Sequence, residues 1–211
     1  KSFGYMITNP PYDKSWKEDK KKIYHEKMLL DHRFELTLTN YIGEEEVLDS
    51  TPRTSDGQLL FLLEEVDKMK PLEFQPQGSR IASIHNGSSL FTGDAGSGES
   101  NIRRYLIEKD LVEAIIQLPN NIFYNTGIST YVWMLTNKKK DNRKGKVQLI
   151  DASQAFEKLR KNQGSRNCTI EPYRTDILRV YTDFVEQEAN EELKVGSKIF
   201  DDDDFRYYNV T

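Results

Sequence analysis

Cysteine is almost missing from this chain of 211 residues, which contains only Cys168. A single cysteine excludes an internal disulfide framework and a zinc site built from several cysteines. The three histidines, His25, His32 and His85, lack the spacing of metal ligands, so we predict no metal site. The chain also lacks an apolar run able to span a bilayer, and its first residues lack the pattern of a signal peptide. These absences favour a cytoplasmic protein that does not cross a membrane.

An excess of positive charge is absent as well, since 34 acidic residues outnumber 30 lysines and arginines and give a formal net charge of −4. This total does not suggest a nucleic-acid binder, although binding depends on a local basic patch more than on the sum. The strongest candidate patch is the segment 138–146, which begins with three lysines. Because it lies between two predicted strands, the favoured interpretation is a solvated hairpin loop, with phosphate contact as the second one.

Strand and helix patterns alternate along the chain, which is typical of an α/β sheet. We predict strands over 3–8, 79–85, 111–118, 129–135 and 147–151, and helices over 58–70 and 99–109. The stretch 16–30 also fits a helix, whereas 36–49 is ambiguous. We therefore divide the chain into residues 1–151, which belong to an α/β domain, and residues 152–211, which we expect to be mainly helical.

The helix over 58–70 has the clearest pattern in the chain. Its apolar residues recur at helical spacing and form one continuous side. Ser55 or Asp56 is expected as its N-cap, and Pro71 is expected to end it.

The tetrapeptide Asn9-Pro10-Pro11-Tyr12 follows directly after the first predicted strand, and α/β sheets bind ligands at the carboxyl ends of their strands. The two prolines fix the backbone and remove N–H donors, so the Asn9 amide oxygen and the Pro10 carbonyl are both free to accept from one planar –NH₂ group. Tyr12 offers a face for stacking on a base.

Two hydrogen-bond acceptors on one planar amine would make its nitrogen more reactive. An aromatic amine is a poor nucleophile because its lone pair is delocalised into the ring. Two acceptors holding its hydrogens would draw the nitrogen toward tetrahedral geometry and free the lone pair for attack on a methyl donor. The alternative is that Asn-Pro-Pro only makes a rigid loop, but the preceding apolar strand favours the catalytic interpretation.

Further segments follow in a specific order. They are Thr8–Tyr12, Ser55–Leu62, Asn86–Phe91, Asn101–Leu106, Leu118–Thr130 and Leu149–Ser153. On these segments, nearly the whole chain resembles the modification (methyltransferase) subunit of type I restriction-modification systems, a γ-type DNA adenine-N6 methyltransferase. His85 is one departure, because the family pattern has proline before Asn86-Gly87, and we expect it to affect only the local loop shape.

The resemblance implies a Rossmann-like, S-adenosylmethionine-dependent fold and a target adenine flipped out of DNA. Asn9, Pro10, Pro11 and Tyr12 would then form the catalytic motif, with Tyr12 stacked on the base. Phe123 or Tyr124 would cover the other side of the adenine, although either residue alone fits a core aromatic that closes a loop equally well. The partners implied are DNA, a DNA-specificity subunit and a restriction subunit, and the target sequence would be set by the specificity subunit.

The family's cofactor loop, an aromatic-x-Gly-x-Gly turn, is expected before the catalytic motif, where this chain has eight residues. The Gly-x-Gly of this chain, Gly96-Ser97-Gly98, is rejected as that loop because of its place in the order. The stretch Gly93–Gly98 is instead predicted to be a flexible loop. We therefore expect an incomplete fold, the C-terminal half of a catalytic domain, in which Asn9 is a shared cofactor contact and which is inactive alone.

Two other functions stay open. The chain would act as an inactive assembly or binding module if the fold were kept without activity, although the intact Asn-Pro-Pro-Tyr argues against this. It would act as a protein glutamine-N5 methyltransferase if the planar amine were a glutamine side chain, although the downstream segments resemble the type I family.

Overall fold

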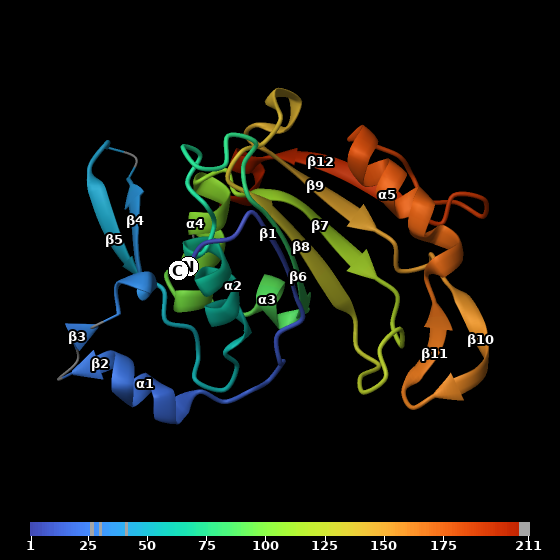
Figure 1. Ribbon diagram of the computed structural model, residues 1–211, viewed down its shortest axis with the longest axis horizontal. Coiled ribbons are helices and arrows are strands. Elements are labelled where there is room, and N and C mark those ends of the chain that lie inside the picture. The colour runs from blue at the N-terminus through green and yellow to red at the C-terminus, as the bar shows by residue number, and fades with distance from the viewer. Residues whose placement is uncertain (26–27, 30, 41, 207–211) are drawn as a thin grey trace.

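A six-stranded mixed sheet forms the centre of the computed structural model, which describes residues 1–25, 28–29, 31–40 and 42–206 (Figure 1). In spatial order its strands are β1 (Tyr5–Thr8), β6 (Arg80–Asn86), β8 (Thr130–Thr136), β7 (Val112–Leu118), β9 (Lys146–Asp151) and β12 (Gly196–Asp201). Five of these strands match the predicted ones with only small shifts at their ends. The predicted α/β class is confirmed as a mixed α/β sheet.

The direction of the strands decides where the loops lie. β1 is parallel to β6, and β7 is parallel to β9. β8 lies antiparallel between β6 and β7, so β6 and β7 also run the same way. The strands β1, β6, β7 and β9 therefore end at one edge, which we call the carboxyl edge. The segments that follow Thr8, Asn86, Leu118 and Asp151 all begin at this edge, which faces the lower side of the view in Figure 1.

Helices pack on both faces of the sheet. They are α2 (Gln58–Asp67), α3 (Ser88–Phe91), α4 (Gly98–Glu108) and α5 (Arg174–Asp183), whereas α1 (Lys17–Ile23) has no buried residue and lies apart from the sheet in Figure 1. On one face Leu62 of α2 and Ile102 of α4 share a core with Trp133 of β8, and on the other Val180 of α5 shares a core with Ile150 of β9. Each such side chain contributes roughly 1.5 to 3 kcal/mol. Within the described residues, no helix is both long and apolar enough to cross a membrane.

The start of α2 differs from the prediction. Gly57, not Ser55 or Asp56, is the N-cap, while the Asp56 carboxylate accepts from the backbone N–H of Gln58 at 3.2 Å. The helix ends at Asp67, before the predicted Lys70. Its predicted apolar side is confirmed, since Leu59, Leu62 and Leu63 are all buried.

The stretch 16–49, after the predicted catalytic motif, is mostly not helical. Only α1 follows the expectation of a helix over 16–30, and β2 (Tyr24–His25) and β3 (Met28–Leu29) come after it. The stretch 36–49 forms the antiparallel hairpin of β4 (Glu35–Thr39) and β5 (Glu45–Asp49). Leu36, Leu38 and Leu48 alternate with exposed residues and join the core that contains α4.

The expectation that residues 152–211 are mainly helical is wrong. The segment contains one α-helix, α5, together with the antiparallel hairpin of β10 (Glu157–Gln163) and β11 (Arg166–Thr169) and the sheet strand β12. β12 is an edge strand that pairs with β9 along its whole length, so the backbone groups that face β9 are satisfied by a strand about fifty residues earlier. Residues 207–211 lie outside the described part.

The basic segment 138–146 is not a solvated hairpin loop, because β8 and β9 are not neighbours in the sheet. Lys139 is buried, and its ammonium group binds the Asp110 carboxylate at 2.5 Å and the Lys146 carbonyl at 2.7 Å. Arg143 is also buried, between the side chain of Gln148 and the carbonyl of Tyr181. Lys139 and Arg143 therefore stabilise the segment between β8 and β9. Only the exposed lysines of this segment remain candidates for phosphate contact.

Candidate functional site

The catalytic motif predicted from the sequence lies directly after β1, at the carboxyl edge of the sheet. Asn9 and Pro11 are exposed, Pro10 is buried, and Tyr12 is half-buried. The Tyr12 hydroxyl donates to the Asn9 side-chain oxygen at 2.6 Å. Burial raises the pKa of Tyr12 to about 12, so this hydroxyl keeps its proton at neutral pH. The bond fixes which end of the Asn9 amide carries the oxygen, and the second lone pair of that oxygen stays available.

The residue before Asn9 is anchored by two other elements. The Thr8 hydroxyl donates to the Glu65 carboxylate of α2 at 2.6 Å and lies 2.7 Å from the Ser83 hydroxyl of β6. Glu65 is buried, and this burial raises the pKa of its carboxyl. Its other oxygen, Oε2, is buried without a hydrogen-bond partner in the described structure. The start of the motif is thus held by buried polar contacts as well as by the strand.

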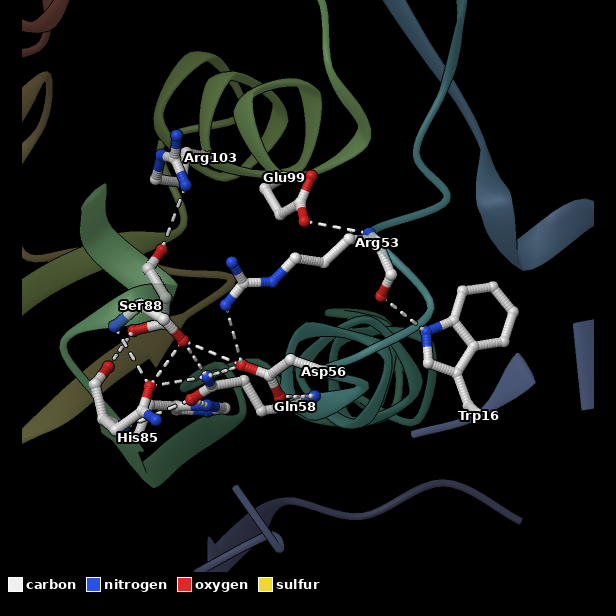
Figure 2. A network of polar contacts seen from close by, with 10 residues as sticks. Trp16, Arg53, Asp56, Gln58, His85, Ser88, Glu99 and Arg103 are labelled. Atoms are coloured by element: carbon white, nitrogen blue, oxygen red, sulfur yellow. Dashed lines mark hydrogen bonds and ion pairs between the residues drawn. The ribbon is translucent and has the colours of Figure 1, made fainter. Parts of the chain in front are cut away.

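Ser83 connects this anchor to His85, which lies at one end of the buried polar network drawn in Figure 2. The His85 ring contacts the Ser83 hydroxyl through Nε2 at 2.9 Å and the Gln58 side-chain oxygen through Nδ1 at 3.2 Å. Burial lowers the pKa of His85 to about 4, and nearby Asp56 offsets this only in part. The imidazole is therefore neutral at pH 7. The expectation that His85 affects only the local loop shape was too narrow.

The far end of the network reaches the loop before α2. The Gln58 amide nitrogen donates to Asp56 and to Asn86, both at 2.6 Å, and Ser88 donates to Asp56 at 2.8 Å. The guanidinium of Arg53 lies 3.7 Å from the Asp56 carboxylate (Figure 2). A continuous chain of polar contacts therefore connects Asp56 to Thr8, the neighbour of Asn9.

The interpretation of the sequence missed these network residues, although a signal was present. Gln58 and Glu65 stand at positions i and i+7 of the side of α2 that also carries Leu62, and all three are buried. Polar residues on a buried helix face require partners. His85 likewise follows a run of apolar and small residues in β6, residues 81–84.

Phe123 and Tyr124 lie in the segment that follows β7 at the same edge. Phe123 is half-buried, whereas the Tyr124 side chain is 57% exposed. The Tyr124 hydroxyl accepts from Arg166 at 2.9 Å, and the Arg166 guanidinium lies 5.2 Å from the ring centre. Tyr124 is thus held in place by the β10–β11 hairpin, while much of it faces solvent.

The two halves of the predicted adenine site are not in contact. β6 and β8 lie between β1 and β7, so the two loops start roughly 14 Å apart at one strand spacing per step. No ring contact or hydrogen bond joins Tyr12 to Phe123 or Tyr124 among the described residues. This spacing leaves room for a flat ligand between side chains that reach from either loop.

A polar cleft of about 500 Å³ opens beside this second loop. Its lining is Gln117, Asn120, Asn121, Ser129, Ser153, Gln154, Phe156, Lys158, Asn167 and Cys168. The lining is rich in amides and contains a lysine but no carboxylate. Such a surface offers donors and acceptors for a polar, anionic ligand.

The Gly96-Ser97-Gly98 turn does not form a cradle that fits a cofactor. Gly98 begins α4, and a Cβ added to it would lie 1.9 Å from the carbonyl oxygen of Thr51. Protein backbone therefore already occupies the space that a phosphate or nucleotide would need. The flexibility expected for Gly93–Gly98 stays a prediction.

Comparison with known proteins gives consistent matches. The family model described as N-6 DNA Methylase matches residues 1–194. The type I restriction enzyme MjaVII methylase subunit of Methanocaldococcus jannaschii is 40% identical over 79 residues, which is 37% of this chain and 13% of that protein. The MjaIX methylase subunit of the same organism is 28% identical over 163 residues, which is 77% of this chain and 25% of that protein.

The fold has solved counterparts. A type I restriction-modification methyltransferase subunit from Streptococcus thermophilus aligns with a TM-score of 0.66 and 25% identity, covering 96% of this chain and 35% of that one. This chain therefore spans about a third or less of the length of the relatives that it matches.

Proposed function

The chain belongs to the N-6 DNA methylase family, and from this premise we propose that its protein methylates the N6 amino group of adenine in DNA. The methyl donor is S-adenosylmethionine, and the protein acts as the modification subunit of a type I restriction-modification system in the cytoplasm. It assembles with a DNA-specificity subunit and a restriction subunit. The observation that carries the proposal is the geometry of Asn9 and Pro10 at the carboxyl edge of the sheet, with Thr8 anchored behind them.

Asn9 and Pro10 perform the central step of the proposed mechanism. The Asn9 side-chain oxygen and the Pro10 carbonyl each accept one hydrogen of the adenine amine. S-adenosylmethionine, when bound, would supply a methyl group from its sulfonium, and the electron pair of the broken S–C bond would stay on the sulfur of a neutral thioether. As the amine nitrogen bonds to carbon it gains positive charge, so both N–H···O bonds strengthen in the transition state and lower the barrier. The surplus amine proton then leaves to solvent, and Asn9 is also proposed to contact the donor.

Tyr12 has two tasks in this proposal. Its ring stacks on the flipped adenine, and its hydroxyl holds the Asn9 amide with the oxygen toward the amine. Because the Asn9 oxygen has two lone pairs, it is able to accept from Tyr12 and from the amine together. The raised pKa of Tyr12 keeps the hydroxyl a donor across the neutral range.

Tyr124 is the better candidate of the two aromatics for the other side of the base. One side of its ring is occupied by Arg166, and more than half of the side chain is exposed. We expect Tyr124→Ala to lower kcat/KM about tenfold or more, because stacking on a base contributes roughly 1 to 3 kcal/mol. Steady-state methylation of a duplex with one target adenine measures this effect.

The control for this prediction is Tyr124→Phe, which keeps the ring and should keep most of the activity. A second comparison is Phe123→Ala, since Phe123 is half-buried and its loss should affect stability more than kcat/KM. If Phe123→Ala lowers kcat/KM and Tyr124→Ala does not, the roles of the two residues are reversed.

Identification of the methylated product tests the proposed function as a whole. The full-length protein, with its specificity subunit, is incubated with radiolabelled S-adenosylmethionine and with two possible substrates, DNA and a protein that contains glutamine. N6-methyladenine in the digested DNA is the expected product. Label in a glutamine side chain would instead support a protein methyltransferase. A folded, assembled complex without transfer to either substrate would support an inactive assembly module.

A further inference from the structure

The β10–β11 hairpin is a basic ribbon on an acidic chain. Residues 157–169 contain four cations and one carboxylate, Glu157. Lys158, Arg160 and Lys161 are exposed, and none of them forms an ion pair with a carboxylate in the described part of the chain. This contrasts with the segment 138–146, in which Lys139 and Arg143 are buried. The positive charge of the hairpin is therefore free to act on an external anion.

The hairpin is not joined to the central sheet but projects beside its carboxyl edge (Figure 1). Backbone contacts fasten it to the segment after β7. The N–H groups of Ser165 and Asn167 donate to the carbonyls of Tyr124 and Asn121 at 2.9 and 3.0 Å. The close approach depends on Gly164, where a Cβ would lie 2.6 Å from the Tyr124 carbonyl oxygen.

Two side chains of β11 contact the same loop. The thiol of Cys168 donates to the Asn120 carbonyl at 3.0 Å, and the guanidinium of Arg166 holds the Tyr124 hydroxyl and ring. The Nε atom of Arg166 is buried without a partner in the described structure. The basic ribbon and the loop of the candidate adenine site thus form one structural unit.

The amide-rich cleft lies between these two parts. Lys158 and Cys168 face each other across the hairpin and both line the cleft, together with Asn120 and Asn121 of the loop. Cations and uncharged amides, with no carboxylate in the lining, match a phosphodiester backbone, which presents anionic oxygens and sugars without exposed donors. An acidic protein surface would match the cations but makes less use of the amide cleft.

We propose that the β10–β11 hairpin binds the phosphodiester backbone of the DNA beside the flipped adenine. Lys158, Arg160 and Lys161 neutralise phosphates, and the Arg166–Tyr124 contact links the bound backbone to the loop that covers the base. This inference rests on the proposed function, because it requires DNA as the substrate. It assigns to the C-terminal segment a direct role in substrate binding.

The salt dependence of DNA binding tests the inference. The variant Lys158→Gln/Arg160→Gln/Lys161→Gln is compared with wild type in the full-length protein assembled with its specificity subunit. The control variant, Lys109→Gln/Lys198→Gln, removes two exposed cations that lie outside both the hairpin and the segment 138–146. Binding to a duplex that carries the target site is measured from 50 to 300 mM salt.

We expect the slope of log affinity against log salt to become less negative by roughly 2 to 3 in the hairpin variant, and affinity to fall about tenfold or more at moderate salt. The control variant should keep the wild-type slope, and all three proteins should have the same melting temperature.

An unchanged slope in the hairpin variant, with wild type methylating adenine, would overturn the inference but leave the proposed function intact. Loss of subunit assembly in the variant, measured by size-exclusion chromatography, would also overturn it and identify the hairpin as a protein-binding surface. Absence of adenine methylation and DNA binding in wild type would instead refute the proposed function.

Discussion

Asn9→Ala is expected to lower the rate of adenine methylation by about a hundredfold to a thousandfold. The substitution removes one of the two acceptors proposed to hold the amine, and this proposed contact would strengthen as positive charge develops on the nitrogen. Loss of one such charge-stabilising group typically has an effect of this size. Because Asn9 is exposed and its side chain bonds only to Tyr12 within the described structure, the fold should be preserved. Single-turnover methylation, with DNA affinity measured separately, gives the effect on the chemical step.

Tyr12→Phe is the matched control for this experiment. It keeps the stacking ring and removes the hydroxyl that orients the Asn9 amide, so we expect a smaller loss, about tenfold. Thermal unfolding of both variants checks the fold. If Asn9→Ala methylates DNA at the wild-type rate, the grip on the amine is not made by this residue and the proposed mechanism is wrong.

The stability of the chain is expected to fall more steeply on acidification in wild type than in His85→Gln. In the folded state burial lowers the pKa of His85 to about 4, whereas an unfolded histidine titrates near pH 6.5. Between these two values the unfolded state binds a proton that the folded state does not, so acid favours unfolding. The contribution lost from pH 6.5 to pH 4 is at most about 3 kcal/mol.

Urea unfolding of both proteins at pH 7.0, 5.5 and 4.5 measures the difference in slope. The comparison is needed because Glu65, in the same network, acts in the opposite direction. Burial raises the pKa of its carboxyl, so the folded state gains this proton first and is stabilised by mild acid. The substitution leaves Glu65 in place and removes only the imidazole. Parallel pH profiles for the two proteins would show that His85 is not a buried neutral ring.

The network behind Asn9 explains why a strand followed by Asn-Pro-Pro-Tyr is not sufficient for a precise site. Glu65, Ser83 and His85 come from α2 and β6, and they set the position of Thr8 through side-chain contacts. A displacement of about 1 Å in such a site is able to lower a rate considerably. The two large predictions therefore concern one structural unit, since Asn9 is proposed to bind the substrate and His85 belongs to the buried network that positions Thr8 before it.

Several features of this protein were determined by its sequence alone. The apolar spacing around Leu59, Leu62 and Leu63 predicted α2, and short apolar runs predicted five of the six sheet strands. The order of the later segments indicated the family, which the match to residues 1–194 confirms, whereas the binding of a planar amine by Asn9-Pro10-Pro11-Tyr12 stays a prediction. These features are local, because helix and strand periodicity and proline geometry act within a few neighbouring residues.

Other features were decided only by the tertiary structure. β12 became a strand by pairing with β9, and the β10–β11 hairpin, which has little apolar alternation, is stabilised by its contacts with the segment after β7. The buried network required Gln58 and Glu65 of α2 to meet His85 of β6. Each of these arrangements depends on groups far apart in the chain that pair to satisfy buried or backbone hydrogen bonds. Such pairing has no local periodicity, so the sequence around each residue does not determine it.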